Sequence, residues 1–223
     1  MMLNLLSKGA EAEIYLVDFF GLKAVAKKRI SKTYRNPQFD QLFIRYRTKI
    51  EGKVLSELYM AGLRVPAVYL VDDEHGLILM EYIEGDRLSN IIDKLDTSKI
   101  LEVAREIGRF AAKIHNLKIY HGDYTLANII LSAKDIVVID FGLSGFSDDI
   151  EEYAIDLHLA IRSINAAIPH MSSEFVEKML NEYRISFNGD ADEVIHRMRE
   201  ISVRGRYVDK ELRKTIAREK YVA

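Results

Sequence analysis

The feature that most constrains the fold is the stretch YHGDYTLANIILSAKDIVVIDFG at residues 120–142. Two short apolar runs surround a polar turn at 132–135, which is the pattern of a β-hairpin. The register set by this turn pairs Leu131 with Ile136 and fixes which residues meet at the open end. The stretch therefore predicts a buried hairpin whose polar ends come together.

Three polar side chains converge at that open end. The register places Asn128 opposite Ile139 and beside Asp140, and Asp123 lies on the loop that enters the hairpin. An amide oxygen and a carboxylate at one place suit a hard divalent cation. A further carboxylate at the rim can orient a hydroxyl nucleophile or accept its proton. Each residue alone is more often a turn or cap residue, but the spacing D-x4-N-x11-D-F-G is specific.

A lysine and a glutamate elsewhere in the chain form a second candidate pair. Lys27 ends the apolar strand AVAK, and a strand lysine by default points into water. Glu51 lies in the helix expected over residues 39–60, and its helical neighbours at +3, +4 and +7 are apolar. Because a buried acid is costly unless it is paired, Lys27 is the predicted partner of Glu51.

Hydrophobic periodicity predicts two lobes with different character. Residues 1–83 give the order β-β-β-α-β-β, a five-stranded sheet with one long helix, and the strand-like runs are 14–17, 24–27, 65–71 and 77–82 besides a first hairpin strand. Residues 84–223 are mainly helical apart from the hairpin. We therefore expect an α+β, two-lobed fold that forms one domain.

The composition excludes several classes of protein. The chain has 223 residues and no cysteine, which rules out disulfides and thiolate metal sites and is typical of an intracellular protein. The opening residues reach Lys8 before a long apolar run develops, and no stretch is apolar enough to span a membrane. We therefore expect a cytoplasmic location and no membrane partner.

The net charge of −2 hides two basic segments. Residues 23–53 carry ten Lys and Arg against two acids, and residues 197–220 carry nine against four. A charged run is most often a solvated face. Two such segments on an otherwise acidic chain also suit an RNA or another phosphate-rich partner.

The motifs together resemble those of protein kinases. VAK at Lys27, Glu51 on the following helix, MEYI after a strand, H-G-D-x4-N and DFG occur in kinase order and at kinase-like distances. The resemblance implies that the α+β, two-lobed fold is protein-kinase-like. More narrowly, GAEAEIY, the run AKKRISKTYRNPQFD, HGDYTLANIIL and the late RGRY resemble the small atypical kinases of the RIO-like group. That group provides the kinase/ATPase subunit of the KEOPS tRNA-modification complex, and the resemblance is to its archaeal form.

The resemblance implies a role for each matching residue. Lys27 and Asp123 would be catalytic, and Glu51 would hold Lys27 in place. Asn128 and Asp140 would bind Mg²⁺ on ATP. Adenine would meet Met80, Glu81 and Ile83, and the phosphates would lie under the hairpin tip of Leu6, Lys8, Gly9, Ala10, Glu11, Ala12 and Ile14. By the same resemblance, Asp156 would anchor the catalytic-loop backbone, and His121 would order that loop.

The departures from ordinary protein kinases concern the substrate. The tip has one glycine where G-x-G-x-x-G has three, Gly122 replaces the arginine before the catalytic aspartate, and Thr125 replaces a lysine. Only residues 143–152 separate DFG from the next helix, and no APE motif follows. The platform for peptide substrates is therefore largely absent, and ATP binding and hydrolysis are favoured over phosphorylation of other proteins.

The leading hypothesis is an ATP/Mg²⁺-dependent atypical serine/threonine kinase or ATPase that supports threonylcarbamoyl-adenosine modification of tRNA. Autophosphorylation would be a side activity, and the partners would be the threonylcarbamoyl-transferase subunit, a small tRNA-binding subunit and tRNA. The basic tail is a candidate tRNA contact, with Arg204, Arg206, Lys210, Arg213 and Lys214.

Two alternatives stay open at this point. A small-molecule phosphotransferase of the aminoglycoside or choline kinase type also uses H-G-D-x4-N, although the intact DFG and the short chain argue against it. A non-catalytic binding module would use the fold only for contacts. The complete set of Lys27, Glu51, Asp123, Asn128 and Asp140 argues against that loss of activity.

Overall fold

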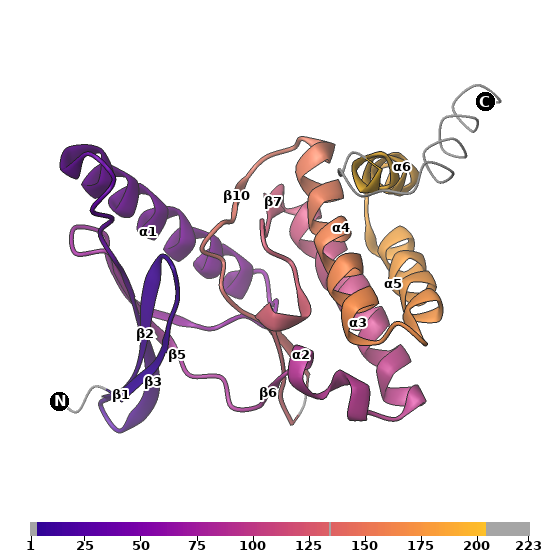
Figure 1. Cartoon of the computed structure of the whole chain (residues 1–223), viewed down its shortest axis with the longest axis horizontal. Helices are drawn as coiled ribbons and strands as arrows, with labels where there is room; N and C mark the ends of the chain where they lie inside the picture. The colour runs from indigo at the N-terminus through magenta and orange to yellow at the C-terminus, as the bar shows by residue number, and fades with distance from the viewer. Residues whose placement is uncertain (1–3, 134, 204–223) are drawn as a thin grey trace. The chain divides into compact units, whose positions relative to one another are not determined.

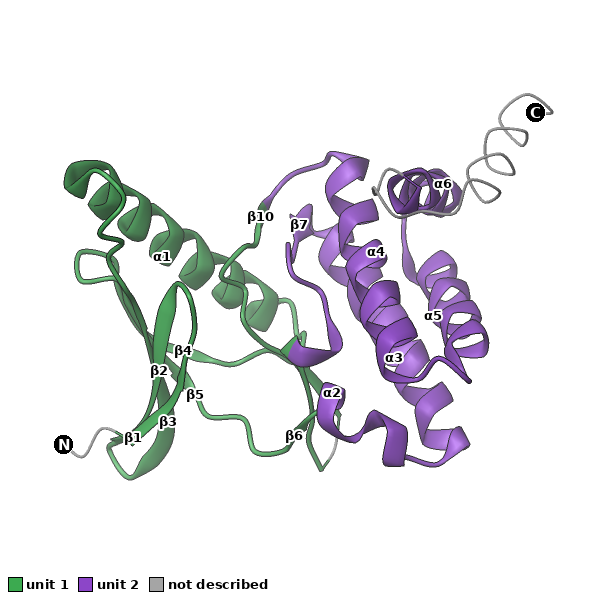
Figure 2. Ribbon diagram, in the orientation of Figure 1, with its two compact units in different colours: residues 1–87, 128–145 green, residues 88–127, 146–223 purple. Residues whose placement is uncertain are grey.

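The computed structural model describes residues 4–133 and 135–203 (Figure 1). It forms two compact units, and the chain passes three times between them (Figure 2). The first unit takes residues 1–87 and 128–145, and the second takes 88–127 and 146–223. The hairpin predicted within residues 129–139 thus belongs to the first unit, and the expected lobe boundary after residue 83 stays a prediction.

An antiparallel five-stranded sheet is the centre of the first unit. Its order is β1-β2-β3-β5-β4, and the predicted sequence of strands and helix is confirmed. Strands β2 and β3 are longer than their apolar runs, because polar ends pair as well, whereas β4 and β5 are shorter than the predicted runs 65–71 and 77–82. Their bounds are Asn4–Lys8 (β1), Ala12–Phe19 (β2), Leu22–Arg29 (β3), Val68–Asp72 (β4) and Leu77–Glu81 (β5).

The tip of the first hairpin lies between Lys8 and Ala12, within the segment that the resemblance implied. The Gly9 N–H donates to the Ala12 carbonyl at 2.9 Å and closes the turn between β1 and β2. The Ile30 N–H, just after β3, donates to the Glu11 carbonyl at 3.0 Å. The tip is therefore tied by backbone bonds to the end of the strand that carries Lys27.

Helix α1 (Pro37–Met60) follows β3 in the chain and packs against β4. The side chain of Asn36 caps its start by accepting from two backbone N–H groups, and Gly62, with φ of +77°, follows its end. Glu51 lies among buried apolar residues, as predicted. Leu42 and Tyr46 share the expected helical spacing but are 66% and 62% exposed, since the first half of α1 leaves that face uncovered.

The second hairpin has the predicted register. Strand β8 (Ile129–Leu131) pairs with β9 (Ile136–Val138), with Leu131 opposite Ile136, and the Ile139 N–H donates to the Asn128 carbonyl at 2.9 Å. The short strand β6 (Asp86–Arg87) pairs with the other edge of β8. The backbone bond at Asn128 therefore fixes the distance between Asn128 and the segment that begins at Asp140.

The second unit is mainly helical, as predicted. Asp96, Asp149 and Asp190 each cap a helix by accepting from a backbone N–H of its first turn. Short helical pieces and strands lie between, and β10 spans the point where the chain leaves the first unit. The bounds are Leu88–Ile91 (α2), Ile92–Lys94 (η1), Thr97–Asn116 (α3), Ile119–Tyr120 (β7), Leu126–Asn128 (η2), Gly145–Phe146 (β10), Ile150–Ala167 (α4), Ser172–Ser186 (α5) and Ala191–Ser202 (α6).

Helices α3 and α5 pack side by side (Figure 1). Gly108 on α3 lies against the backbone of Met179 on α5. In residues 4–133 and 135–203, no helix combines the length and apolar character needed to cross a membrane.

The change Gly108→Ala tests this packing. A methyl group there would collide with the backbone carbonyl of Met179 on α5, so the helices would have to separate. We expect the free energy of unfolding to fall by about 1–3 kcal/mol in urea denaturation, although alanine normally favours a helix by about 1 kcal/mol over glycine. The exposed control Lys113→Ala should change it by less than about 0.5 kcal/mol. An unchanged Gly108→Ala variant would contradict the close approach.

Candidate active site

The ammonium of Lys27 is the centre of the site in the first unit. Its Nζ lies 2.5 Å from Glu51 Oε1 and 2.6 Å from Asp140 Oδ1. The Lys27 side chain is 8% exposed and that of Glu51 is 1% exposed. The predicted pairing of Lys27 with Glu51 is confirmed. Strand β3, helix α1 and the segment after β9 thus bring one charged group each to the same place.

Arg29 completes this group and was missed by the sequence analysis. Its Nη2 lies 2.6 Å from Glu51 Oε2, so both oxygens of the buried carboxylate accept from cations. The strand alternation that places Val25 and Lys27 on one face also places Arg29 there, and this was the available signal. Its Nη1 also lies 3.9 Å from Glu11 Oε2 at the hairpin tip.

The electrostatics of Lys27 follow from its partners. Burial alone lowers the pKa of the ammonium, but the carboxylates of Glu51 and Asp140 outweigh burial and leave the pKa raised above its usual value. Lys27 is therefore held in its charged form. A fixed positive charge of this kind suits phosphate oxygens.

Asp140 and Asn128 provide oxygen ligands beside this charge. Asp140 has φ of +62°, a left-handed conformation that is uncommon for a residue other than glycine, and its side chain is 52% exposed. Asn128 is buried and directly precedes β8, and its carbonyl accepts from the Ile139 N–H next to Asp140. One amide oxygen and one carboxylate fit Mg²⁺, which retains water and takes its other ligands from substrate phosphates.

The other residues expected around a nucleotide also lie in the first unit. Leu6 and Lys8 are exposed on β1, and Lys8 pairs with Glu13 at 2.8 Å. The central part of β5 and the residues that follow it place Met80 and Ile83 in the interior. Glu81 carries a bidentate pair with Arg64 and donates its N–H to a backbone carbonyl.

Asp123 lies in the second unit, on a loop whose backbone is hydrogen-bonded to a buried carboxylate. The carboxylate of Asp156 on α4 accepts from the N–H groups of His121 at 2.6 Å and Gly122 at 2.8 Å. The Asp123 N–H contacts His121 Nδ1 at 3.2 Å. Gly122 has φ of +80°, which favours glycine. The predicted roles of Asp156 and His121 in ordering this loop are confirmed.

A buried histidine supports the same anchor. His115 on α3 lies 3.4 Å from Asp156 through Nε2 and 2.9 Å from the hydroxyl of Tyr183 through Nδ1, and its ring stacks on Tyr153. Burial lowers the pKa of His115, although Asp156 opposes the shift. These contacts give His115 a structural role.

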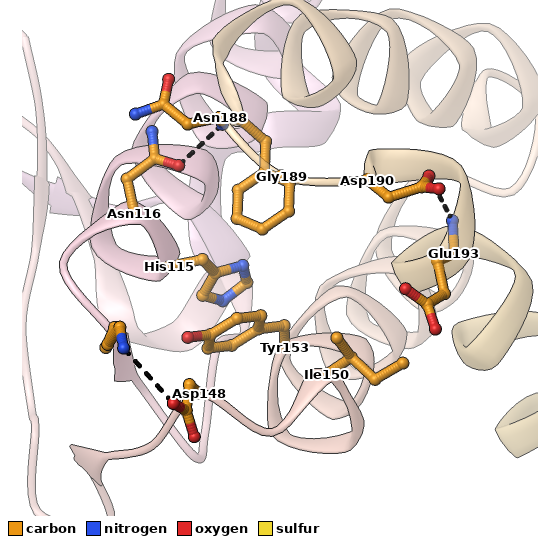
Figure 3. A pocket seen from close by; sticks show the side chains of 11 residues that line it. His115, Asn116, Asp148, Ile150, Tyr153, Asn188, Gly189, Asp190 and Glu193 are labelled. Atoms are coloured by element: carbon orange, nitrogen blue, oxygen red, sulfur yellow. Dashed lines mark hydrogen bonds and ion pairs between the residues drawn. The ribbon is translucent and has the colours of Figure 1, made fainter.

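A pocket of about 310 Å³ also lies in the second unit, where Figure 3 shows His115 and Tyr153 among its lining side chains. Lys118 and Asp148 pair at 3.3 Å on its rim. The residues predicted for ATP or metal do not line it.

The structure therefore joins Lys27, Glu51 and Asp140 directly, with Asn128 adjoining them, and places Asp123 on the second unit. The five residues predicted for tRNA binding lie outside the described part of the chain (Arg204, Arg206, Lys210, Arg213, Lys214).

Solved structures establish the class of fold. The Rio2 kinase–ADP/Mg²⁺–phosphoaspartate complex from Chaetomium thermophilum has a TM-score of 0.64 and 15% identity, over 94% of this chain and 67% of that one. The ADP-bound aminoglycoside phosphotransferase APH(2'')-Ib has a TM-score of 0.60 and 16% identity, over 98% and 91%. The predicted protein-kinase-like fold is confirmed.

Sequence relatives narrow the class. A RIO domain profile matches residues 14–149, which defines a phosphotransferase of the atypical RIO kinase type. The KEOPS complex subunit Bud32 of Pyrococcus abyssi is 38% identical over 213 residues, which are 92% of this chain and 96% of that protein. The chain belongs to the RIO-domain family, in the group of these Bud32 proteins.

Some relatives are longer than this chain. A probable bifunctional tRNA threonylcarbamoyladenosine biosynthesis protein of Methanobrevibacter smithii is 39% identical over 204 residues. The match covers 92% of this chain and 37% of that protein. The chain thus corresponds to one part of the bifunctional relative.

The lowered pKa of His115 predicts a pH dependence of stability. The unfolded chain binds a proton at His115 near pH 6.5, whereas the folded chain does so only at lower pH, so stability falls as pH drops below about 6.5. In urea unfolding between pH 5 and 8, His115→Gln should flatten this slope by up to about 1.4 kcal/mol per pH unit. The exposed control His170→Gln should keep the wild-type slope. A slope unaltered by His115→Gln would contradict this assignment.

Proposed function

We propose that the chain binds ATP with Mg²⁺ and transfers or hydrolyses its γ-phosphate, as the kinase or ATPase subunit of a KEOPS-type complex. The observation that carries this proposal is the position of Lys27 Nζ, 2.5 Å from Glu51 and 2.6 Å from Asp140. This arrangement supplies one oriented cation beside a carboxylate that can take a metal. Phosphoryl transfer depends on such positioning and charge stabilisation.

Each side chain has a distinct proposed role. Lys27 contacts the α- and β-phosphates while Glu51 fixes its direction, and Asn128 and Asp140 hold Mg²⁺, which supplies positive charge to the phosphates. Asp123 orients the attacking hydroxyl or water and accepts its proton. The new bond forms at the γ-phosphorus as the bond to the bridging oxygen breaks, and that oxygen leaves with ADP.

The rest of the nucleotide is assigned to the remaining predicted residues. Met80 lines the back of the adenine site, and the backbone of residues 81–83 bonds the base. The hairpin tip covers the phosphates through its backbone N–H groups; the residues concerned are Leu6, Lys8, Gly9, Ala10, Glu11, Ala12 and Ile14. One glycine in the tip makes this cover looser than a three-glycine loop allows.

The biological setting is proposed from the relatives. The names of the Pyrococcus and Methanobrevibacter proteins refer to the KEOPS complex and to threonylcarbamoyladenosine in tRNA. For this chain we propose a cytoplasmic role beside the threonylcarbamoyl-transferase subunit and the small tRNA-binding subunit, with tRNA contacted by the basic tail. Serine autophosphorylation is proposed as a side activity. The likeness to an aminoglycoside phosphotransferase, at 16% identity, concerns the fold alone. It therefore supports the small-molecule alternative less strongly than the 38% identity to the Pyrococcus protein supports the KEOPS-type role.

Variants of the charged group test the catalytic assignment. Asp140→Ala and Lys27→Met should each lower ATP turnover by about 100-fold or more, because each removes one charge-stabilising contact. Asp148→Ala changes an exposed aspartate of the second unit and should stay within about two-fold of wild type. Unchanged Mg²⁺-dependent binding and turnover in Asp140→Ala would refute the assignment.

Partner dependence tests the biological setting. ATP turnover should rise several-fold when tRNA and the transferase subunit are added together. A chain that ignores both partners and phosphorylates a sugar or an amine far faster than it hydrolyses ATP would instead be a small-molecule kinase.

A further inference from the structure

Two backbone carbonyls after Asp140 accept hydrogen bonds from arginines of other elements. Arg47 on α1 donates from Nε to the Gly142 carbonyl at 3.1 Å, from Nη2 to the same oxygen, and from Nη1 to the Ser144 carbonyl at 3.4 Å. Arg29 on β3 donates from Nη2 to the Gly142 carbonyl at 3.4 Å. All of these residues belong to the first unit.

The bonded segment is buried and has a defined turn of its own. Ser144 is fully buried, and both its N–H and its hydroxyl donate to the Phe141 carbonyl, at 3.1 and 2.7 Å. The Gly142 N–H donates to Asp140 Oδ1 at 3.3 Å. The arginines therefore donate hydrogen bonds to the Gly142 and Ser144 carbonyls of a compact turn that begins at Asp140.

Gly142 couples the position of this turn to the ion pair. A β-carbon there would lie 3.0 Å from Asp140 Oδ1 and 3.1 Å from Lys27 Nζ. The backbone at Gly142 therefore lies so close to these two charged atoms that a side chain there would be in tight contact with them. A shift of the Gly142 carbonyl away from Arg47 must carry Asp140 with it.

The two arginines occupy positions that the sequence relates to the site. Arg47 precedes Glu51 by four residues, on the same face of α1, and Arg29 follows Lys27 by two residues on β3. Each element therefore contributes one residue to the Lys27–Glu51 pair and one arginine to the turn. Arginine suits this task because its planar fork can serve two carbonyls at once, whereas a lysine ammonium is a single point charge.

We propose that Arg47 and Arg29 are positioning residues that hold the 140–144 turn, and with it the Asp140 carboxylate, in the orientation that takes the metal. The inference rests on the proposed function. In kinases switched by phosphorylation, arginines order the loop by capturing a phosphorylated residue. Here the arginines bind backbone carbonyls, so the turn is ordered without a phosphate, consistent with Gly122 at the usual arginine position of the catalytic loop.

Amide hydrogen exchange of the ligand-free chain tests the ordering directly. Arg47→Met removes the three donors and keeps a long side chain. We expect exchange in residues 141–144 to become about ten-fold faster or more, since the lost contacts are charge-assisted. Arg45→Met is the matched control, because Arg45 lies two residues earlier and pairs instead with Asp73 at 3.0 Å. Equal exchange in Arg47→Met and wild type would overturn the proposal.

The Mg²⁺ dependence of ATP turnover separates positioning from simple stabilisation. In Arg47→Met the half-saturating Mg²⁺ concentration should rise about ten-fold, while KM for ATP at saturating Mg²⁺ changes less than about three-fold. Arg47→Lys should bring the half-saturating Mg²⁺ concentration only part of the way back to the wild-type value, because one ammonium cannot replace the several donors of the planar guanidinium. A uniform loss of turnover with an unchanged Mg²⁺ requirement would make Arg47 a fold-stabilising residue and overturn the proposal.

The two proposals fail in distinguishable ways. If the wild-type chain showed no Mg²⁺-dependent ATP binding, the proposed function would fail. The exchange experiment, which needs no nucleotide, would still decide whether Arg47 orders the turn.

Discussion

The buried carboxylate of Glu51 is the interaction on which the first unit depends. Its two oxygens accept from Lys27 at 2.5 Å and Arg29 at 2.6 Å, on a side chain that is 1% exposed. Removal of a carboxylate from water costs several kcal/mol, so a buried Glu51 requires both partners. The pairing fixes β3 against α1, and because Lys27 also meets Asp140, it fixes the DFG segment to both.

This dependence explains why the first unit is built from distant parts of the chain. The sheet and α1 come from residues 4–87, while the hairpin and the Asp140 turn come from 128–145. The intervening helices belong to the second unit, where Asp156 anchors the loop that carries Asp123. Each unit thus orders its own proposed catalytic groups through one buried carboxylate, Glu51 in the first and Asp156 in the second.

The periodicity of apolar residues was sufficient to predict the hairpin of residues 129–139 and the buried face of α1 around Glu51. The turn at 132–135 set the hairpin register, and apolar neighbours of Glu51 implied its buried partner; both are observed. Long-range contacts of side chains that look ordinary in sequence were not predictable. Arg29 and Arg47 belong to a basic run that reads as a solvated face, and only tertiary structure brings them to Glu51 and Gly142. Leu42 and Tyr46 have apolar helical spacing and are nevertheless exposed, which shows that spacing alone does not tell which face of a helix is covered.

Calorimetric titration of the Glu51→Gln variant with Mg²⁺–ATP and with adenosine tests the central claim most directly. Glutamine keeps the shape of Glu51 but removes the negative charge that pairs with Lys27 from α1. The Kd for Mg²⁺–ATP should rise by about ten-fold or more, while the Kd for adenosine, which has no phosphates, stays within about two-fold. Glu57→Gln, at a surface pair on the same helix, should change neither value. Equal affinity of Glu51→Gln and wild type for Mg²⁺–ATP would contradict the claim that this buried carboxylate organises a phosphate site.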